Sequence, residues 1–255
     1  MSFFGKLKNE GLEQSEDRLG GGYRAFDTDI YTGTVKMAYA GKSAGGAQNF
    51  TVIVGLGNRE YRETIYVTNK KGEHWYTDKE DPKKKQPLPG FTTMNDLCLV
   101  CTGKELAEQD TEEKMVKIYD YEAKKELPKS VEVLVELLGK PVSLAIVQQL
   151  ENKSEKQGND YVPVADTRTT NLIEKVLDPD SKMTVFEATH NATESVFWDS
   201  WVERNKGQVR DKRTIKDDGS TGSSGRPSSR ASNSNTAPTA GAAQTPRKSL
   251  FGARA

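Results

Sequence analysis

The chain has few of the residues that build most metal sites and disulfide scaffolds. Its 255 residues include only two cysteines, Cys98 and Cys101, and two histidines, His74 and His190. Two cysteines are too few for a disulfide scaffold, and they are consistent with a reducing compartment. A structural zinc site needs four ligands, which a single C-x-x-C pair does not supply. We therefore expect both cysteines to pack in a core, with no metal and no cofactor.

Enzyme signatures are also missing. The stretch 41–43 (Gly-Lys-Ser) resembles the end of a phosphate-binding loop, but Lys36 stands where that motif needs a glycine. The stretch 55–57 begins like a dinucleotide-binding fingerprint, but Glu60 replaces its third glycine. No nucleophile–base spacing is present, so we expect a protein without enzymatic activity. The 37 acidic residues leave a small carboxylate–metal nuclease open as an alternative.

Long apolar runs are absent too. No stretch approaches the roughly 20 apolar residues that span a bilayer. A lysine interrupts the first eight residues, so they do not form the apolar centre of a signal peptide. We expect no membrane association and a cytosolic location in the cell that makes the protein.

Charge is distributed unevenly along the chain. The formal net charge is zero, yet residues 207–255 hold nine Lys/Arg and three Asp/Glu. This segment is rich in Gly, Ser, Pro and Ala, and such a composition does not bury enough apolar surface to offset the entropy of ordering. We expect three parts: an N-terminal arm (1–28), one folded domain (29–206) and a disordered basic tail (207–255).

The clearest structural signal lies between residues 29 and 68. Segments 30–39, 48–56 and 60–68 are rich in β-branched and aromatic residues that alternate with polar ones. The glycine-rich stretch 40–47 suits a loop, and Gly57 with Asn58 suits a tight turn. These features predict an antiparallel meander of three strands.

Further elements follow from periodicity and turn residues. We expect an irregular hairpin at 69–91, a helix at 92–102 capped by Thr92 and ended by Gly103, an inserted hairpin within 104–130, core strands at 131–138 and 142–150, a loop at 151–160, a last strand at 161–165, and a final helix that is capped by Asn191 and packs through Trp198 and Trp201. Three strands, a helix and two more strands is the order of an OB-type barrel. The predicted fold is therefore mainly β: an OB-type barrel with a helix between strands three and four, an inserted hairpin, a C-terminal helix and a disordered tail.

Cations and aromatic rings are interleaved in the meander and the hairpin after it. Binding of single-stranded nucleic acid needs both, because cations follow the phosphates and bases stack on rings. Strand alternation places Arg62, Thr64 and Tyr66 on one face, with Lys36 in a similar polar row. The candidate DNA-binding residues are Lys36, Lys42, Arg59, Arg62, Tyr66, Lys70, Lys71, Trp75, Tyr76, Lys83, Lys84 and Lys85.

A more ordinary interpretation of these residues stays open. Each ring could pack in a core, and a run of lysines is often only a solvated surface. The DNA-binding hypothesis therefore depends on the whole cluster, and the preference for DNA or RNA is not determined. Proteins that act by binding a protein partner remain a second functional class.

The end of the tail has a pattern suited to partner binding. A small apolar pair stands among positive charges in Arg247, Lys248, Leu250, Phe251 and Arg254. Such a tag on a long tether can dock into a partner's pocket. The alternative is nonspecific electrostatic help in DNA binding.

Several strings of the sequence carry a resemblance to a known family. They are 17–22 (DRLGGG), 31–39, 61–65 (YRETI) and 88–97 (LPGFTTMNDL). Over roughly residues 1–180 the chain resembles the single-stranded DNA-binding proteins of lytic tailed phages, such as coliphage N-four and its relatives.

This resemblance implies a function and partners. It implies sequence-independent coating and protection of single-stranded DNA during phage replication and recombination, in the cytoplasm of the infected bacterial host. Phage replication proteins are possible partners, and close members of the family imply contact with host RNA polymerase in late transcription. The alternative function is therefore a transcription co-activator that contacts this polymerase through the tail. Because the chain ends basic, the acidic-tail mechanism common in this functional class does not transfer to it.

Overall fold

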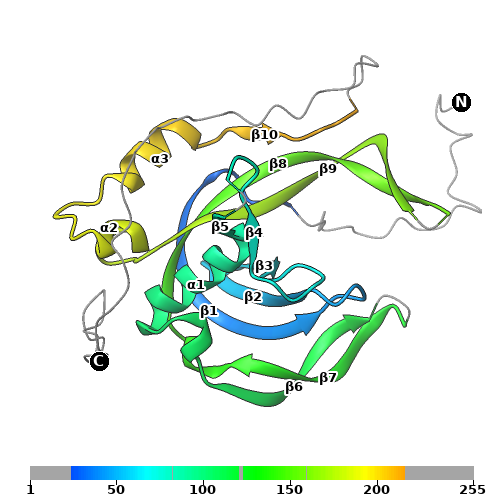
Figure 1. Ribbon diagram of the computed structural model, residues 1–255, viewed down its shortest axis with the longest axis horizontal. Coiled ribbons are helices and arrows are strands. Elements are labelled where there is room, and N and C mark those ends of the chain that lie inside the picture. Colours follow the sequence, from blue (N-terminus) through cyan, green and yellow to red (C-terminus); the bar gives the residue numbers. More distant parts are fainter. Residues whose placement is uncertain (1–23, 82, 121–122, 159, 216–255) are drawn as a thin grey trace, which may run out of the picture.

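The computed structural model describes residues 24–81, 83–120, 123–158 and 160–215 (Figure 1). This part of the chain is mainly β. One sheet has the strand order β10–β8–β1–β2–β3, with β9 paired to β8 and the β6–β7 hairpin paired to β1 through β7. All its pairs are antiparallel except β10 with β8. The strands are β1 (Asp29–Lys42), β2 (Gln48–Leu56), β3 (Arg59–Tyr66), β4 (Trp75–Thr77), β5 (Lys85–Pro87), β6 (Thr111–Asp120), β7 (Lys125–Leu134), β8 (Pro141–Gln157), β9 (Asp160–Leu177) and β10 (Val209–Asp211).

The predicted meander is confirmed. β1 pairs with β2 up to Lys42 opposite Gln48, and β2 pairs with β3 from Leu56 opposite Arg59. Gly57 begins the connecting turn with a φ of 63°, a conformation that glycine adopts without the steric cost of a side chain. Strand alternation thus places every second side chain of these three strands on the same face.

The helix between the third and fourth predicted strands is also present. α1 (Pro89–Thr102) begins three residues before the predicted start, with Leu88 in the cap position and Pro89 in the first turn. Proline suits this position because its missing N–H has no partner there in any helix. Gly103 ends α1 in the left-handed region, as predicted. Both cysteines of α1 are buried in the core, as predicted.

Two groups of apolar side chains pack on opposite faces of the sheet. On the inner face, α1 packs against a cluster that includes Val54, Ile65, Leu144 and Ile146. On the outer face of β8, α3 (Phe197–Asn205) packs through Trp201 against Ala145, Val147 and Leu177. Successive residues of β8 therefore serve two cores, which explains why its sequence is an almost continuous apolar run.

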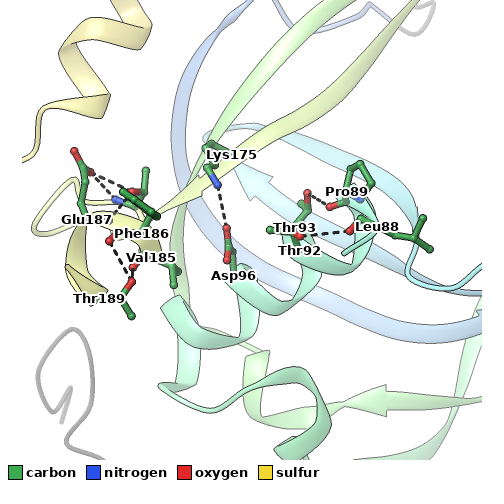
Figure 2. A network of polar contacts seen from close by, with 11 residues as sticks. Leu88, Pro89, Thr92, Thr93, Asp96, Lys175, Val185, Phe186, Glu187 and Thr189 are labelled. Atoms are coloured by element: carbon green, nitrogen blue, oxygen red, sulfur yellow. Dashed lines mark hydrogen bonds and ion pairs between the residues drawn. The ribbon is translucent and has the colours of Figure 1, made fainter. Parts of the chain in front are cut away.

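The sheet is open within the described residues, so the closed barrel predicted from the element order is not what is observed. β3 and β9 are both edge strands on this side, and no strand pairing joins them. One side chain spans the opening, since Glu63 Oε2 accepts a hydrogen bond from the Ile173 N–H at 2.8 Å. Asp96 of α1 adds an ion pair to Lys175 of β9 at 3.4 Å (Figure 2).

The loop predicted at 151–160 was wrong, and the last strand predicted at 161–165 is only part of a longer strand. Residues 151–160 are not a loop, because β8 runs on to Gln157 and β9 begins at Asp160. The two strands form a long arm whose outer part is exposed on both faces (Figure 1). An arm with solvent on both sides has no hydrophobic alternation, so the pattern that identifies strands is missing there.

The inserted hairpin is confirmed as β6 and β7, with a different boundary. β7 is the second strand of the hairpin and also includes the first part of the core strand predicted at 131–138. The short 3₁₀ helix η2 (Val135–Leu137) replaces the end of that predicted strand. A second 3₁₀ helix, η1 (Leu106–Glu108), lies between α1 and β6.

The cap predicted for the last helix was wrong. Asn191 lies in a turn with positive φ, and α3 begins only at Phe197. Its first amides are bound by Glu187 of α2 (Val185–Thr189), whose Oε1 accepts from Val196 N at 2.9 Å and Phe197 N at 2.8 Å. Figure 2 shows Glu187 together with Val185, Phe186 and Thr189 of α2. The side chain that stabilises the start of α3 thus comes from the preceding helix.

Ordered structure extends beyond both ends of the predicted domain. Before residue 29, Phe26 is buried and exchanges backbone hydrogen bonds with the Asn171 amide. After residue 206, β10 pairs with β8, and Asn152 binds the backbone of Thr214 and Ile215. The first nine residues of the predicted tail are therefore part of the fold.

Candidate nucleic-acid interface

The outer face of the β1–β3 meander, turned away from α1, gathers several predicted site residues. Val52, Val54 and Ile65 point inward to the core, so the alternate positions point outward. The register places Arg62 beside Ile53, Thr64 beside Thr51, and Tyr66 beside Asn49. We call this surface the outer face, and its exposed polar members are Lys36, Arg62, Thr64 and Tyr66.

Tyr66 is the most exposed ring of the meander, with 51% of its surface accessible. The backbone at Tyr66 is fixed from the other side of the sheet by α1. A Cβ atom on Gly90 would lie 2.1 Å from the Tyr66 carbonyl oxygen, so only glycine permits this close approach of helix and strand. The ring is thus presented to solvent from a rigid backbone.

The neighbours of Tyr66 on the outer face are tied together by hydrogen bonds. Arg62 Nη2 donates to the Tyr39 hydroxyl at 2.7 Å, and the hydroxyls of Thr51 and Thr64 lie 3.0 Å apart. Arg62 remains exposed beyond this contact. A cation held by one hydrogen bond keeps further guanidinium donors for a phosphate.

Lys36 joins the same face through an irregularity in β1. The register of β1 against β2 shifts between Val35 and Met37, so Lys36 is the extra residue of a bulge. The Lys36 side chain lies over Gly55, since a Cβ atom built on Gly55 would be 2.7 Å from Lys36 Cε. The bulge therefore adds a cation to the row that contains Arg62.

Three predicted lysines lie near the Tyr66 end of the strands. Lys42 stands opposite Gln48 at the end of the β1–β2 hairpin. The Lys70 side chain lies over Gly45 in the loop of that hairpin, and Lys71 is the next residue of the turn after β3. All three are exposed, so they add positive charge at this end of the strands.

Within the described part of the chain, α3 covers one part of the outer face and leaves another part exposed. α3 covers the side formed by Ile30, Ala145 and Val147. The half formed by β2, β3 and the later part of β1 carries Arg62 and Tyr66 in exposed positions. The cations and the ring therefore lie on the half of the face that α3 leaves open.

Arg59 does not belong to this surface. Its guanidinium lies 3.9 Å from the centre of the Phe26 ring, and Nη2 donates to the Arg24 carbonyl. Arg59 is two residues before Tyr61 on β3, so it lies on the same face of the strand as Tyr61, which faces the core. Arg59 thus fixes the segment before β1, and its predicted role at the outer face is not supported by its position.

The predicted aromatic pair Trp75 and Tyr76 lies on the separate β4–β5 hairpin. Trp75 is half-buried, and Lys85 Nζ lies 3.7 Å from the centre of its ring. Its cross-strand partner Pro87 lines a cavity together with Glu63 and Ile65 on the α1 side of β3. Apart from Arg59, the predicted residues therefore fall into a group on or near the outer face and a group on the hairpin.

The lysine run of this hairpin is partly balanced by acids. Lys84 lies 3.9 Å from Asp81, and the Lys83 N–H binds Asp81 Oδ1. Asp78 accepts the N–H groups of Glu80 and Asp81, and these backbone hydrogen bonds lower the pKa of Asp78. The loop is thus less cationic than the run Lys83, Lys84 and Lys85 implies.

Exposed aromatic residues on the β6–β7 hairpin and on the β8–β9 arm were not among the predicted site residues. Tyr161 is 71% exposed on β9 and stands opposite Lys156 of β8, and Tyr119 is 44% exposed on β6. A signal was present in both cases, because each tyrosine has lysines within a few residues along the chain. The predicted tail residues Arg247, Lys248, Leu250, Phe251 and Arg254 lie outside the described part of the chain.

Among the described residues, no group of three or more His, Cys, Asp or Glu side chains could hold a metal ion. None of the helices described in the structure is both long and apolar enough to cross a membrane. No protein-family model matches the chain, and no curated protein matches it.

Proposed function

We propose that this protein binds single-stranded DNA through the part of the outer face that α3 leaves exposed, without regard to base sequence. The observation that supports this most directly is the exposed ring of Tyr66 on one strand with Arg62, near Lys36 and beside a lysine-bearing end of the sheet. Rings that accept any base and cations that follow phosphates are the features of sequence-independent binders. The chemistry needed is binding alone, so the proposed role has no catalytic step.

The strand order supports the same proposal. The meander β1–β3, then α1, then β8 and β9 follows the order of an OB-type barrel, with the β6–β7 hairpin inserted before β8. We interpret the fold as an opened OB-type arrangement whose outer face keeps the usual binding role. Coating and protection of single strands in phage replication and recombination, within an infected bacterial cell, is the context that we propose.

The magnitudes are adequate for useful affinity. Stacking contributes about 1–3 kcal/mol per base. Each neutralised phosphate of a single strand adds about 0.7 to the slope of log K against log salt. One stacked base with cations at Lys36, Arg62, Lys42, Lys70 and Lys71 therefore gives salt-sensitive binding.

The test is a titration of labelled oligo(dT) followed by fluorescence anisotropy. Tyr66→Ala should weaken binding by about 10- to 100-fold, which corresponds to the loss of one stacked base. Phe186→Ala is the matched control, because Phe186 is a 65% exposed ring on α2. Equal affinity of wild type for duplex and single strands, or equal losses in the two variants, would contradict the proposal.

A further inference from the structure

A cavity of about 420 Å³ lies where the sheet is open, between β3 and β9. The first turn of α1 and the end of β5 close its base. We call it the seam cleft. Its volume lies within the range of about 300–1,000 Å³ that is typical of ligand-binding pockets.

The lining of the seam cleft combines apolar walls with negative charge. Ile65, Pro87 and Leu172 are among its apolar residues. Its charged lining residues are three carboxylates, of Glu63, Asp96 and Glu174, and one ammonium group, of Lys175. The cleft therefore fits a ligand with apolar or aromatic groups and a positive charge.

The carboxylates differ in their contacts. Asp96 is paired with Lys175 at 3.4 Å, and Glu174 binds both Trp201 and Arg210. Glu63 accepts from neutral donors, the Tyr61 hydroxyl at 2.5 Å and the Ile173 N–H at 2.8 Å. A cation placed near Glu63 would thus meet a carboxylate that accepts hydrogen bonds from two neutral donors, and such a cation favours the charged form.

The chain itself carries a segment with this chemistry. Residues 1–8 (MSFFGKLK) contain Phe3, Phe4 and Leu7 together with Lys6 and Lys8, and no acid. The described part of the chain also begins next to the cleft. Phe26 packs edge-on against Tyr61, and its backbone binds Asn171.

The distance is easily covered. Tyr61 and Asn171 are each two residues from the cleft residues Glu63 and Ile173, which is about 7 Å along a strand. Fifteen residues lie between position 8 and position 24, and an extended chain spans up to about 3.3–3.6 Å per residue. A segment attached so near its site has an effective concentration in the millimolar range.

We propose that the seam cleft binds residues 1–8 of the same chain, with Phe3 and Phe4 against the apolar walls and Lys6 near Glu63. The other end of the chain offers a competing occupant, because Ser249–Gly252 (SLFG) resembles Ser2–Gly5 (SFFG) and is also flanked by cations. The connection of the chain at Phe26 favours the N-terminal segment, since it enters the fold beside the cleft.

The test is hydrogen exchange on the full-length protein, read at peptides that cover 63–66 and 172–176. Phe3→Ala/Phe4→Ala should raise exchange at both peptides by about tenfold or more, because a bound segment stabilises the residues that contact it. Leu250→Ala/Phe251→Ala is the matched control at the other end, and it should leave exchange unchanged. No DNA is present, so the outcome is independent of the DNA-binding proposal.

Three outcomes would overturn the inference. Unchanged exchange in both variants would show that neither end fills the cleft. A rise only in Leu250→Ala/Phe251→Ala would make the C-terminal segment the occupant. Sedimentation equilibrium adds the third: if wild type is a dimer that Phe3→Ala/Phe4→Ala dissociates, the segment comes from a second copy.

Discussion

The carboxylate of Glu63 on β3 accepts a hydrogen bond from the backbone N–H of Ile173 on β9 at 2.8 Å. The Tyr61 hydroxyl donates to the same oxygen at 2.5 Å. β9 is irregular here, since its register against β8 shifts next to Ile173. One side chain thus joins two strand edges that no strand pairing joins in the described sheet.

The first prediction concerns the stability that this contact provides. Glu63→Ala should lower the free energy of unfolding by about 2–4 kcal/mol, because two largely buried donors lose their acceptor. Glu63→Gln should cost much less, since its amide oxygen can accept both bonds. Urea denaturation at pH 7 measures both values. Equal losses in the two variants would show that the hydrogen bonds are not what matters.

The second prediction follows from the pKa of the same group. Burial raises the pKa of Glu63, and the bonds from Tyr61 and Ile173 only partly oppose this. A carboxyl with a raised folded pKa contributes fully below its unfolded pKa of about 4.3, and this contribution declines as pH rises toward the folded value. The free energy of unfolding of Glu63→Gln, relative to that of wild type, should therefore increase as pH rises from 4. Urea denaturation at several pH values measures this difference. A difference that is constant with pH would contradict the assignment.

The third prediction tests the close contact between α1 and β3. Gly90→Ala places a Cβ about 2 Å from the Tyr66 carbonyl oxygen, so helix and strand must separate. We expect a loss of about 1–3 kcal/mol in stability, as for other overpacked sites. Thr92→Ala, two residues on, is the control and should cost less. Thermal unfolding measures both, and equal melting temperatures would disprove the clash.

The fourth prediction concerns the start of α3. Burial acts to raise the pKa of Glu187, but its bonds from Thr184, Phe197 and Val196 outweigh burial, so the pKa is lowered. A lowered folded pKa means that the contribution is present above the unfolded pKa and is lost as pH falls through the folded value. Acid should therefore loosen α3 around Trp201, seen as a change in tryptophan emission below about pH 4. Glu187→Gln should abolish this acid-dependent step.

The fifth prediction separates charge from stacking at the outer face. Lys36→Ala/Arg62→Ala should reduce the slope of log K against log salt for oligo(dT) by about 1.4, which is two phosphates at about 0.7 each. Tyr66→Ala should weaken binding without changing this slope. Lys212→Ala serves as the control, because Lys212 is an exposed lysine just after β10. An unchanged slope in the double variant would remove both cations from the interface.

Part of the candidate site was predictable because strand alternation is a local property. The pattern around Arg62, Thr64 and Tyr66 placed them on one face, and the register confirms this arrangement. The position of Arg59 was not predictable, since its contact with Phe26 joins segments 33 residues apart. The separation of Trp75 from Tyr66 was not predictable either, because the local sequence does not specify how the hairpin that carries Trp75 is oriented.

The sequence by itself determined the meander, the end of α1 at Gly103, and the burial of both cysteines, because each depends on neighbouring residues along the chain. Only the tertiary structure decided that the sheet stays open at β3 and β9, and that α3 covers one half of the outer face. The physical reason is that alternation shows which side chains share a face. What covers that face depends on packing between distant segments.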